Sequence, residues 1–322
     1  IRFYKQALDI DPRQPEVQNN IATLLIQVGR YREAVNHYRA ALQDKPGMHA
    51  ARRNLALTLE HLGKHDEALA EFRQVLLADP RDINALLAVS NAQAAANDWA
   101  QAMAGYQQVL RIDPLNAEAY NRIGLVHMFQ NEDAKALDAF RKALNLSPDL
   151  VEGWFNLGQL FLKTQNYDDA AKAFDGVLKL NPRHGPASFQ RGWLYEMQSQ
   201  EKLAIERYRL TIEVLPRFPD AMERLAWILA TSNDPSIRSH DEAITLAKQA
   251  VALTRRQRAT TLDTLAVAHA AAGQYTEAVA AAKLALRQAR AQKDAQLIQQ
   301  VTARLKAYEA SLKAATPPAT PQ

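Results

Sequence analysis

The chain has 322 residues, of which 48% are hydrophobic and 23% charged, and its net charge is +4. A charge this small for the length argues against a nucleic-acid partner, and nucleic-acid binding is kept only as the third alternative. The absence of cysteine excludes disulfides and thiol chemistry and fits the cytoplasm and the periplasm equally. Because no apolar run approaches the roughly 18 residues of a membrane span, we expect this stretch of chain to be soluble.

Seven prolines recur along the chain, each 34 residues after the one before. An aromatic residue stands eight residues before each proline, and an alanine stands four residues before each aromatic wherever the chain extends that far. A fixed period of this length indicates one supersecondary unit repeated many times. The prolines are Pro12, Pro46, Pro80, Pro114, Pro148, Pro182 and Pro216; the aromatics are Tyr4, Tyr38, Phe72, Tyr106, Phe140, Phe174 and Tyr208; the alanines are Ala34, Ala68, Ala102, Ala136, Ala170 and Ala204.

Each period is predicted to be a hairpin of two helices. An alanine and an aromatic four residues apart lie on one helix face. Proline ends the second helix because it lacks an amide donor and its predecessor avoids helical angles. Between the two helices stand residues that tolerate a left-handed backbone, which closes the first helix. These are Gly29, Gly63, Asn97, Asn131 and Gly273.

In chain order, residues 1–14 are predicted to be the second helix of a truncated unit, so we expect more protein upstream. Residues 15–293 form eight complete units, and residues 294–315 form an amphipathic helix that caps the last hairpin. Residues 316–322, rich in Pro and Thr, are expected to be disordered. The first helices of the eight units are predicted to begin at Pro15, His49, Ile83, Ala117, Val151, Gly185, Pro219 and Ala259.

The seventh unit carries an insertion at residues 233–238. The next alanine of the 34-residue period is expected at residue 238, but it stands instead at residue 243. Ser239 and Glu242 have the spacing of a capping box, which predicts that the second helix restarts there. We interpret the insertion as a tolerated loop extension, with a contribution to a partner-binding edge as the alternative.

These columns resemble the tetratricopeptide repeat (TPR), and the resemblance covers nearly the whole chain. It implies an all-α, right-handed superhelical solenoid that acts as a protein-protein interaction scaffold through its surface. The residues close to a consensus unit are Trp154, Phe155, Asn156, Leu157 and Gly158, followed by Tyr167, Ala170, Phe174 and Pro182.

Enzymatic chemistry has no recognisable motif in this sequence. The chain lacks a GxSxG nucleophile elbow, a Walker-type loop and a GxGxxG fingerprint. His61 and His65 are four residues apart, but Gly63 places them on either side of a predicted turn, which argues against a metal pair. We therefore expect no enzyme activity, no catalytic residues, no cofactor and no metal.

By resemblance, the first helices line a concave groove that binds an extended peptide or partner segment. Asparagines at one position of the unit resemble the ladder in the O-linked N-acetylglucosamine transferase repeats, whose amides hold a peptide backbone, but Arg122 and Gln190 interrupt it. Groove aromatics are candidate anchors, and Trp193 and Trp227 remain open between anchor and core. The candidate partner-binding residues are Asn19, Asn20, Arg53, Asn54, Asn121, Arg122, Phe155, Asn156, Phe189, Gln190, Trp193, Arg224 and Trp227.

The C-terminal third resembles the closing repeats of bacterial TPR proteins, some of which carry a membrane glycosyltransferase module. The matching stretches are residues 225–231, 234–235, 242–243 and 263–266. An acceptor-positioning C-terminal domain of a bacterial membrane glycosyltransferase is therefore the alternative to a free-standing interaction scaffold. The sequence identifies neither the partner nor the oligomeric state.

Overall fold

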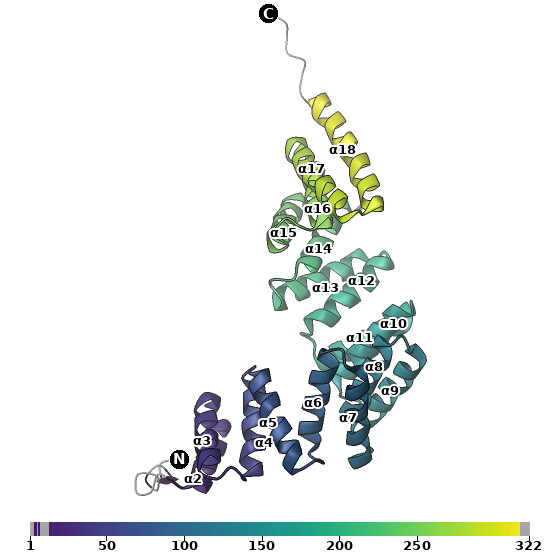
Figure 1. Cartoon of the computed structure of the whole chain (residues 1–322). Helices are drawn as coiled ribbons and strands as arrows, with labels where there is room; N and C mark the ends of the chain where they lie inside the picture. The colour runs from purple at the N-terminus through teal and green to yellow at the C-terminus, as the bar shows by residue number, and fades with distance from the viewer. Residues whose placement is uncertain (1–2, 5, 7–12, 316–322) are drawn as a thin grey trace, which may run out of the picture. The chain divides into compact units, whose positions relative to one another are not determined.

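The computed structural model describes residues 3–4, 6 and 13–315, and every regular element in this part of the chain is a helix. Figure 1 labels the helices. Their bounds are α2 Pro15–Gln27, α3 Tyr31–Asp44, α4 His49–His61, α5 His65–Ala78, α6 Ile83–Ala95, α7 Trp99–Ile112, α8 Ala117–Phe129, α9 Asp133–Leu146, α10 Val151–Lys163, α11 Tyr167–Leu180, α12 Gly185–Met197, α13 Glu201–Val214, α14 Pro219–Thr231, α15 His240–Leu253, α16 Ala259–Ala271, α17 Tyr275–Gln292 and α18 Ala295–Ala315.

The helices follow the predicted period. Each of the eight first helices has 13 residues and begins at the predicted residue. The five predicted turn residues all have positive φ, from 61° at Asn97 and Asn131 to 75° at Gly29. A left-handed residue lets the chain leave the first helix while its last carbonyls stay hydrogen-bonded. The predicted helix starts and turn residues are therefore confirmed.

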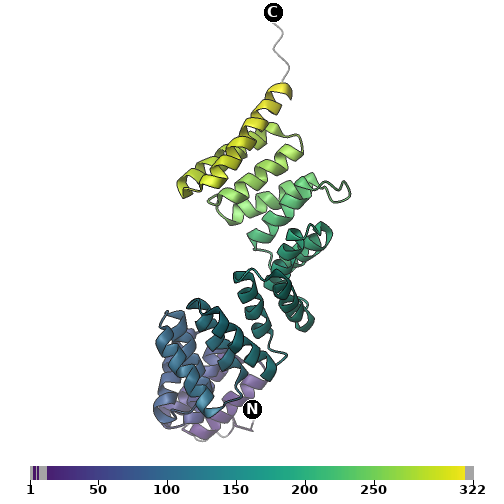
Figure 2. The same cartoon turned by 90° about the vertical axis from the view of Figure 1, so that its right-hand side faces the viewer.

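The helices gather into two compact units, an N-terminal unit that ends at Leu160 and a C-terminal unit that begins at Phe161. In the N-terminal unit α3 packs against α4, α5 against α6 and α7 against α8 (Figure 1). In the C-terminal unit α13 packs against α14, α15 against α16 and α17 against α18 (Figure 2). Within each unit, hairpins therefore bury their apolar faces against their neighbours, as stacked repeats do.

The periodic aromatic column lies at the centre of the hairpins. Burying a side chain of this size contributes roughly 1.5–3 kcal/mol. The Tyr106 hydroxyl donates to Asn91 Oδ1 at 2.7 Å, and the Tyr208 hydroxyl donates to Glu196 Oε2 at 2.7 Å. Both acceptors lie on the first helix of the same hairpin, so these tyrosines also tie the two helices together. The aromatics exposed by at most 1% are Tyr38, Phe72, Tyr106, Phe140, Phe174 and Tyr208.

Two glycines make room for these rings. A Cβ atom added at Gly124 of α8 would lie 2.6 Å from the Phe140 ring, and one added at Gly192 of α12 would lie 2.8 Å from the Tyr208 ring. Carbon atoms in contact are normally about 3.5–4.0 Å apart. The close approach of the two helices in these hairpins therefore requires glycine at both positions.

We expect Gly124→Ala to lower the free energy of unfolding by about 1–3 kcal/mol, the usual cost of overpacking a core. The reason is that the Phe140 ring is fully buried and must shift to admit the methyl group. Urea denaturation followed by circular dichroism measures the change. Gly47→Ala is the matched control, because an added Cβ there meets no atom within 4 Å. Equal midpoints for Gly124→Ala and the parent would contradict the packing argument.

The insertion forms a connection between α14 and α15. The Ser232 hydroxyl holds it by donating to Glu201 Oε2 at 2.5 Å. The predicted capping box is wrong: Ser239 precedes α15 but makes no side-chain cap hydrogen bond. Glu242 instead accepts two hydrogen bonds from Arg209, at 3.0 and 3.1 Å. The backbone N–H of Ser239, which a capping box would pair with Glu242, donates instead to the Leu229 carbonyl at 3.1 Å.

Helix α18 packs an apolar stripe against α16 and α17. Leu297 and Val301 are buried, and Ile298, Leu305 and Tyr308 pack against the same cluster. This is the pattern expected of a helix that covers the last hairpin. Residues 1–2, 5, 7–12 and 316–322, which include most of the truncated unit and the predicted disordered tail, lie outside the described residues. None of the described helices combines the length and the apolarity that crossing a membrane requires.

Candidate functional site

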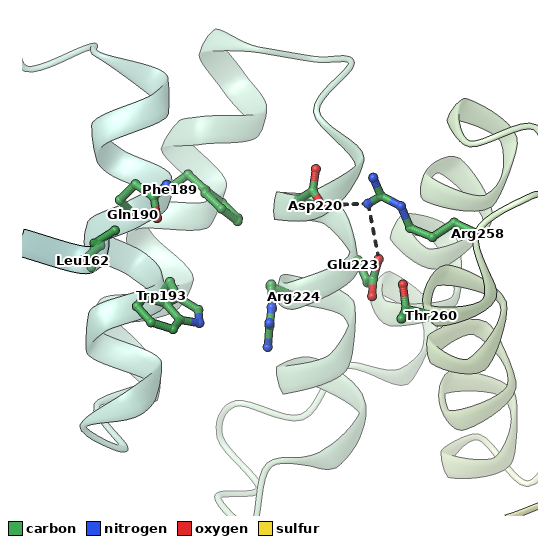
Figure 3. A pocket seen from close by; sticks show the side chains of 9 residues that line it. All are labelled: Leu162, Phe189, Gln190, Trp193, Asp220, Glu223, Arg224, Arg258 and Thr260. Atoms are coloured by element: carbon green, nitrogen blue, oxygen red, sulfur yellow. Dashed lines mark hydrogen bonds and ion pairs between the residues drawn. The ribbon is translucent and has the colours of Figure 1, made fainter. Parts of the chain in front are cut away.

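The first helices of the C-terminal unit share a hollowed face. Its larger depression, the α12–α14 hollow, has a volume of about 580 Å³ and is seen in close-up in Figure 3. Four of the predicted partner-binding residues come together in it, from α12 and α14. The hollow is lined by Leu162, Phe189, Gln190, Trp193, Asp220, Glu223, Arg224, Arg258 and Thr260.

One wall of the α12–α14 hollow is aromatic. Phe189 and Trp193 project from α12 into the space between α12 and α14 (Figure 3), and both are half-buried. The Trp193 ring packs edge-on against Tyr167 with centroids 5.8 Å apart, and Phe189 packs edge-on against Phe218 at 5.0 Å. These contacts hold the two rings in place without covering them, which leaves a rigid apolar surface.

The opposite wall is charged but balanced. Arg258 pairs with Asp220 at 2.6 Å and lies 3.8 Å from Glu223 (Figure 3). Burial raises the pKa of Glu223, and the nearby Thr260 hydroxyl and Arg258 guanidinium oppose that rise. Arg224 is exposed and lies 3.3 Å from a carboxylate oxygen on α12. The hollow therefore presents ion pairs rather than an excess of one charge.

A second depression, the α14–α18 hollow, adjoins the first and shares three lining residues with it. Its volume is about 410 Å³. Arg304 reaches from α18 to form an ion pair with Asp263, and its guanidinium lies 5.2 Å from the centre of the Trp227 ring. Asp263 is only 4% exposed, and burial raises the pKa of its carboxyl group. The residues that line this hollow are Glu223, Arg224, Trp227, Thr260, Asp263, Thr264, Leu297, Gln300 and Arg304.

The indole N–H groups of Trp193 and Trp227 donate no hydrogen bond within the part of the chain that the structure describes. The indole N–H of Trp154, by contrast, donates to the Pro148 carbonyl at 2.8 Å. Neither the Trp193 nor the Trp227 indole nitrogen is among the buried polar atoms of the described residues that lack a partner, so both N–H groups are accessible to water or to a ligand. The two adjoining hollows therefore each combine an apolar ring with a donor that a ligand can satisfy.

The N-terminal unit has hollows of its own. The Trp99 hollow, of about 390 Å³, is formed by α6, α7 and α8. The Tyr31 hollow, of about 380 Å³, is formed by α2, α3 and α4 and contains Asn54. The Trp99 hollow is lined by Asn91, Ala94, Ala95, Asn97, Trp99, Tyr106, Arg122, Leu125, Val126 and Phe129.

The structure brings some of the predicted residues together and separates others. Phe189, Gln190, Trp193, Arg224 and Trp227 line the two hollows of the C-terminal unit. Arg122 and Asn54 line the two separate hollows of the N-terminal unit. The remaining predicted residues line none of these four hollows, and they are Asn19, Asn20, Arg53, Asn121, Phe155 and Asn156.

Two of the predicted asparagines contact each other. Asn156 Nδ2 donates to Asn121 Oδ1 at 3.0 Å, and the Asn121 side chain is fully buried. Arg53 is paired with the buried carboxylate of Asp82. Asn20 is exposed. The asparagine column is therefore not a uniform row of available amides, because its members differ in burial and in partners.

Several residues of the hollows were not predicted. Asp220 and Glu223 lie on α14, a first helix, so the expectation that first helices line the groove could have found them. Trp99 opens a second helix, and Arg304 lies on α18. The groove candidates were chosen from the first helices, so the repeat pattern could not indicate a residue of a second helix or of α18.

The described part of the chain holds no group of three or more His, Cys, Asp or Glu side chains arranged to bind a metal ion. His61 ends α4 and His65 begins α5, on either side of the Gly63 turn. The His61 ring instead packs against Tyr31 with centroids 4.0 Å apart.

Family models described as tetratricopeptide repeat or TPR repeat match residues 19–83, 90–130, 128–165, 151–184 and 258–290, which together span more than half of the chain. No curated protein sequence matches the chain. Among solved structures, pilF of Pseudomonas aeruginosa is 19% identical, with a TM-score of 0.55 over 66% of this chain and 96% of that chain.

Two further solved structures are similar over part of the chain. A thermophilic TPR protein of Thermus thermophilus is 22% identical over 57% of this chain and 100% of its own, with a TM-score of 0.46. YrrB, described as a TPR protein with an unusual peptide-binding site, is 20% identical over 58% of this chain and 96% of its own, with a TM-score of 0.41. Likeness at such identities concerns the fold alone. From its repeat columns, its helix hairpins and the family matches, the chain belongs to the tetratricopeptide repeat family, an all-α scaffold fold that is generally non-catalytic and binds protein or peptide partners.

Proposed function

We propose that this chain is a non-catalytic protein-protein interaction scaffold that binds an extended peptide or partner segment along the groove face of its first helices. The observation that carries the proposal is the pair of half-buried tryptophans in adjoining hollows, each with an unused indole N–H. Partly buried tryptophans in shaped depressions are typical binding hot spots. Phe189, Gln190 and Arg224 lie beside them and supply further apolar and polar contacts.

The remaining candidate residues are expected to play smaller parts. Asn54 lines the smaller Tyr31 hollow, and Asn156 donates to Asn121, so part of the Asn156 amide is already used inside the protein. The candidates of the N-terminal unit contact the ligand only if it extends onto that unit, and they are Asn19, Asn20, Arg53, Asn54, Asn121, Arg122, Phe155 and Asn156.

For a ligand that extends onto the N-terminal unit, we expect Asn54→Ala and Asn156→Ala each to weaken binding by about 0.5–1.5 kcal/mol, the range for a single neutral hydrogen bond. Calorimetric titration with a ligand peptide measures the change. Asn36→Ala, on the exposed side of α3, is the matched control and should leave the dissociation constant unchanged. A loss of affinity in either asparagine variant as large as that in a tryptophan variant would contradict the expectation that the asparagines contribute less to binding.

The proposal is tested by fluorine NMR of the full chain labelled with fluorotryptophan. Peptides selected from a random display library supply the ligand, and single tryptophan variants assign the resonances of the 4 tryptophans. Binding in the groove of the C-terminal unit should move the signals of Trp193 and Trp227 and leave that of Trp154 in place. Selected peptides that bind without moving either groove signal would refute the proposed site.

A further inference from the structure

The Trp99 hollow differs from the hollows of the C-terminal unit in chemistry. Its floor is the stacked pair Trp99 and Phe129, whose ring centroids are 5.1 Å apart with planes inclined by 18°. Phe129 remains 61% exposed in this stack. The exposed part of this stack offers aromatic surface to any side chain that enters the depression. The floor therefore suits a large apolar side chain brought by another molecule.

Arg122 is the only charged residue among the ten that line this hollow. Its Nε is buried and has no hydrogen-bond partner in the described part of the chain. Its Nη2 donates a long hydrogen bond to Glu118 at 3.4 Å and also lies 3.4 Å from Glu152, whereas Nε has no such contact among the described residues. Those two carboxylates are 46% and 63% exposed and do not line the hollow. A carboxylate inside the hollow would thus meet an incompletely satisfied guanidinium, which favours short charge-assisted hydrogen bonds.

The neighbouring amide adds a second donor. The Tyr106 hydroxyl donates to Asn91 Oδ1 at 2.7 Å, so the group of Asn91 left for a ligand is its NH₂. The lining of the hollow contains no acidic residue to repel an anion. The α12–α14 hollow, by contrast, is lined by two arginines and two carboxylates. The two units therefore present different charge patterns to a partner.

We propose that the Trp99 hollow is a second docking site whose occupant is a protein segment that places a large apolar side chain next to a carboxylate. The apolar side chain lies on the Trp99–Phe129 stack, and the carboxylate accepts hydrogen bonds from Arg122 and Asn91. This proposal rests on the proposed function only in treating the chain as a scaffold for protein segments. It uses residues of the N-terminal unit alone. Its test is therefore independent of whether Trp193 and Trp227 in the C-terminal unit bind a ligand.

The test uses the full chain labelled with fluorotryptophan and capped synthetic peptides. The first probe is acetyl-Gly-Ser-Phe-Asp-Ser-Gly-amide, and the matched probes carry Asn or Lys in place of Asp. Capping removes the terminal carboxylate, so only the side-chain carboxylate can act. The Asp peptide should move the Trp99 resonance and bind roughly fivefold or more tighter than the Asn peptide, because its hydrogen bonds are charge-assisted. The Lys peptide should bind weakest.

Variants locate the effect. Arg122→Gln should abolish the preference for Asp over Asn, whereas Arg39→Gln, a control at an exposed arginine of α3, should keep it. If Arg122→Gln does not fold, the peptide series on the unaltered protein decides alone. Equal affinities for the Asp and Asn peptides, or no movement of the Trp99 signal at millimolar peptide, would overturn the proposal. Movement of only the Trp193 and Trp227 signals would overturn it too, while supporting the groove of the C-terminal unit.

Discussion

Trp193→Ala is expected to weaken binding of a groove peptide by about 2 kcal/mol or more, roughly 30-fold in Kd. The indole lies half-buried on the wall of the α12–α14 hollow, and its edge-on contact with Tyr167 fixes the ring before any ligand arrives. A preordered anchor loses little conformational freedom on binding, so its removal costs most of its contact energy. Calorimetric titration of the parent and the variant with one selected peptide measures the difference.

Stability must be measured alongside binding, because the two groove tryptophans differ in their contacts. Trp227 packs against the buried cluster of the C-terminal unit, whereas Trp193 is not part of that packing. Trp227→Ala should therefore lower both affinity and the urea midpoint, and Trp193→Ala should lower chiefly affinity. Trp154→Ala, in the N-terminal unit, is the matched tryptophan control and should bind like the parent. Parent-like affinity in the Trp193 variant would mean that the ligand uses another face.

The repeat period predicted the helices because the same few physical requirements recur in every unit. Small residues permit close helix approach, aromatics fill the space between, and a left-handed residue closes each first helix. Gly124 against Phe140 and the turn at Gly63 show that these requirements are met in three dimensions. Prediction from the period works here because each unit folds against its immediate neighbours.

Side chains that interact across units of the pattern could not be predicted in this way. The ion pair of Arg304 with Asp263 joins residues from α18 and α16, and the rotation of α18 follows no repeat column. The Trp99–Phe129 stack joins the start of α7 to the end of α8, which the period keeps apart in sequence. Glu242 does not cap α15, because the Ser239 N–H donates to the Leu229 carbonyl and Arg209 holds the Glu242 carboxylate. Each case depends on a contact between elements, which a single column does not encode.

Arg304→Met is expected to lower the free energy of unfolding of the C-terminal unit by about 3 kcal/mol near neutral pH. This is the lower end of the range for breaking a buried ion pair, because the Arg304 side chain is itself 28% exposed. Its partner Asp263 has a side chain only 6% exposed, and Asp263 Oδ1 has no hydrogen-bond partner in the described part of the chain. Removing Arg304 therefore leaves a buried carboxylate without its counter-charge. Urea midpoints of the parent and the variant measure the loss.

The pH dependence separates this electrostatic loss from lost packing on Trp227. Burial already raises the folded-state pKa of Asp263 above its ordinary value of 3.8, and Arg304 opposes that rise. A raised folded-state pKa means that stability is fully present below the unfolded value and is lost as the pH rises through the folded value. Without Arg304 the folded value moves higher, so the deficit of Arg304→Met should grow as the pH rises above the ordinary carboxyl value.

Two further variants complete the comparison. Adding Asp263→Asn to Arg304→Met removes the buried charge and should recover much of the lost stability near neutral pH. Arg209→Met breaks an ion pair whose partners are 55% and 39% exposed, and should cost less than about 1 kcal/mol with little dependence on pH. A deficit of Arg304→Met that stays the same at every pH would assign the role of Arg304 to the packing of its aliphatic stem on Trp227. A deficit that grows with pH and is relieved by Asp263→Asn would assign it to the counter-charge that α18 supplies to the hollowed face of the C-terminal unit.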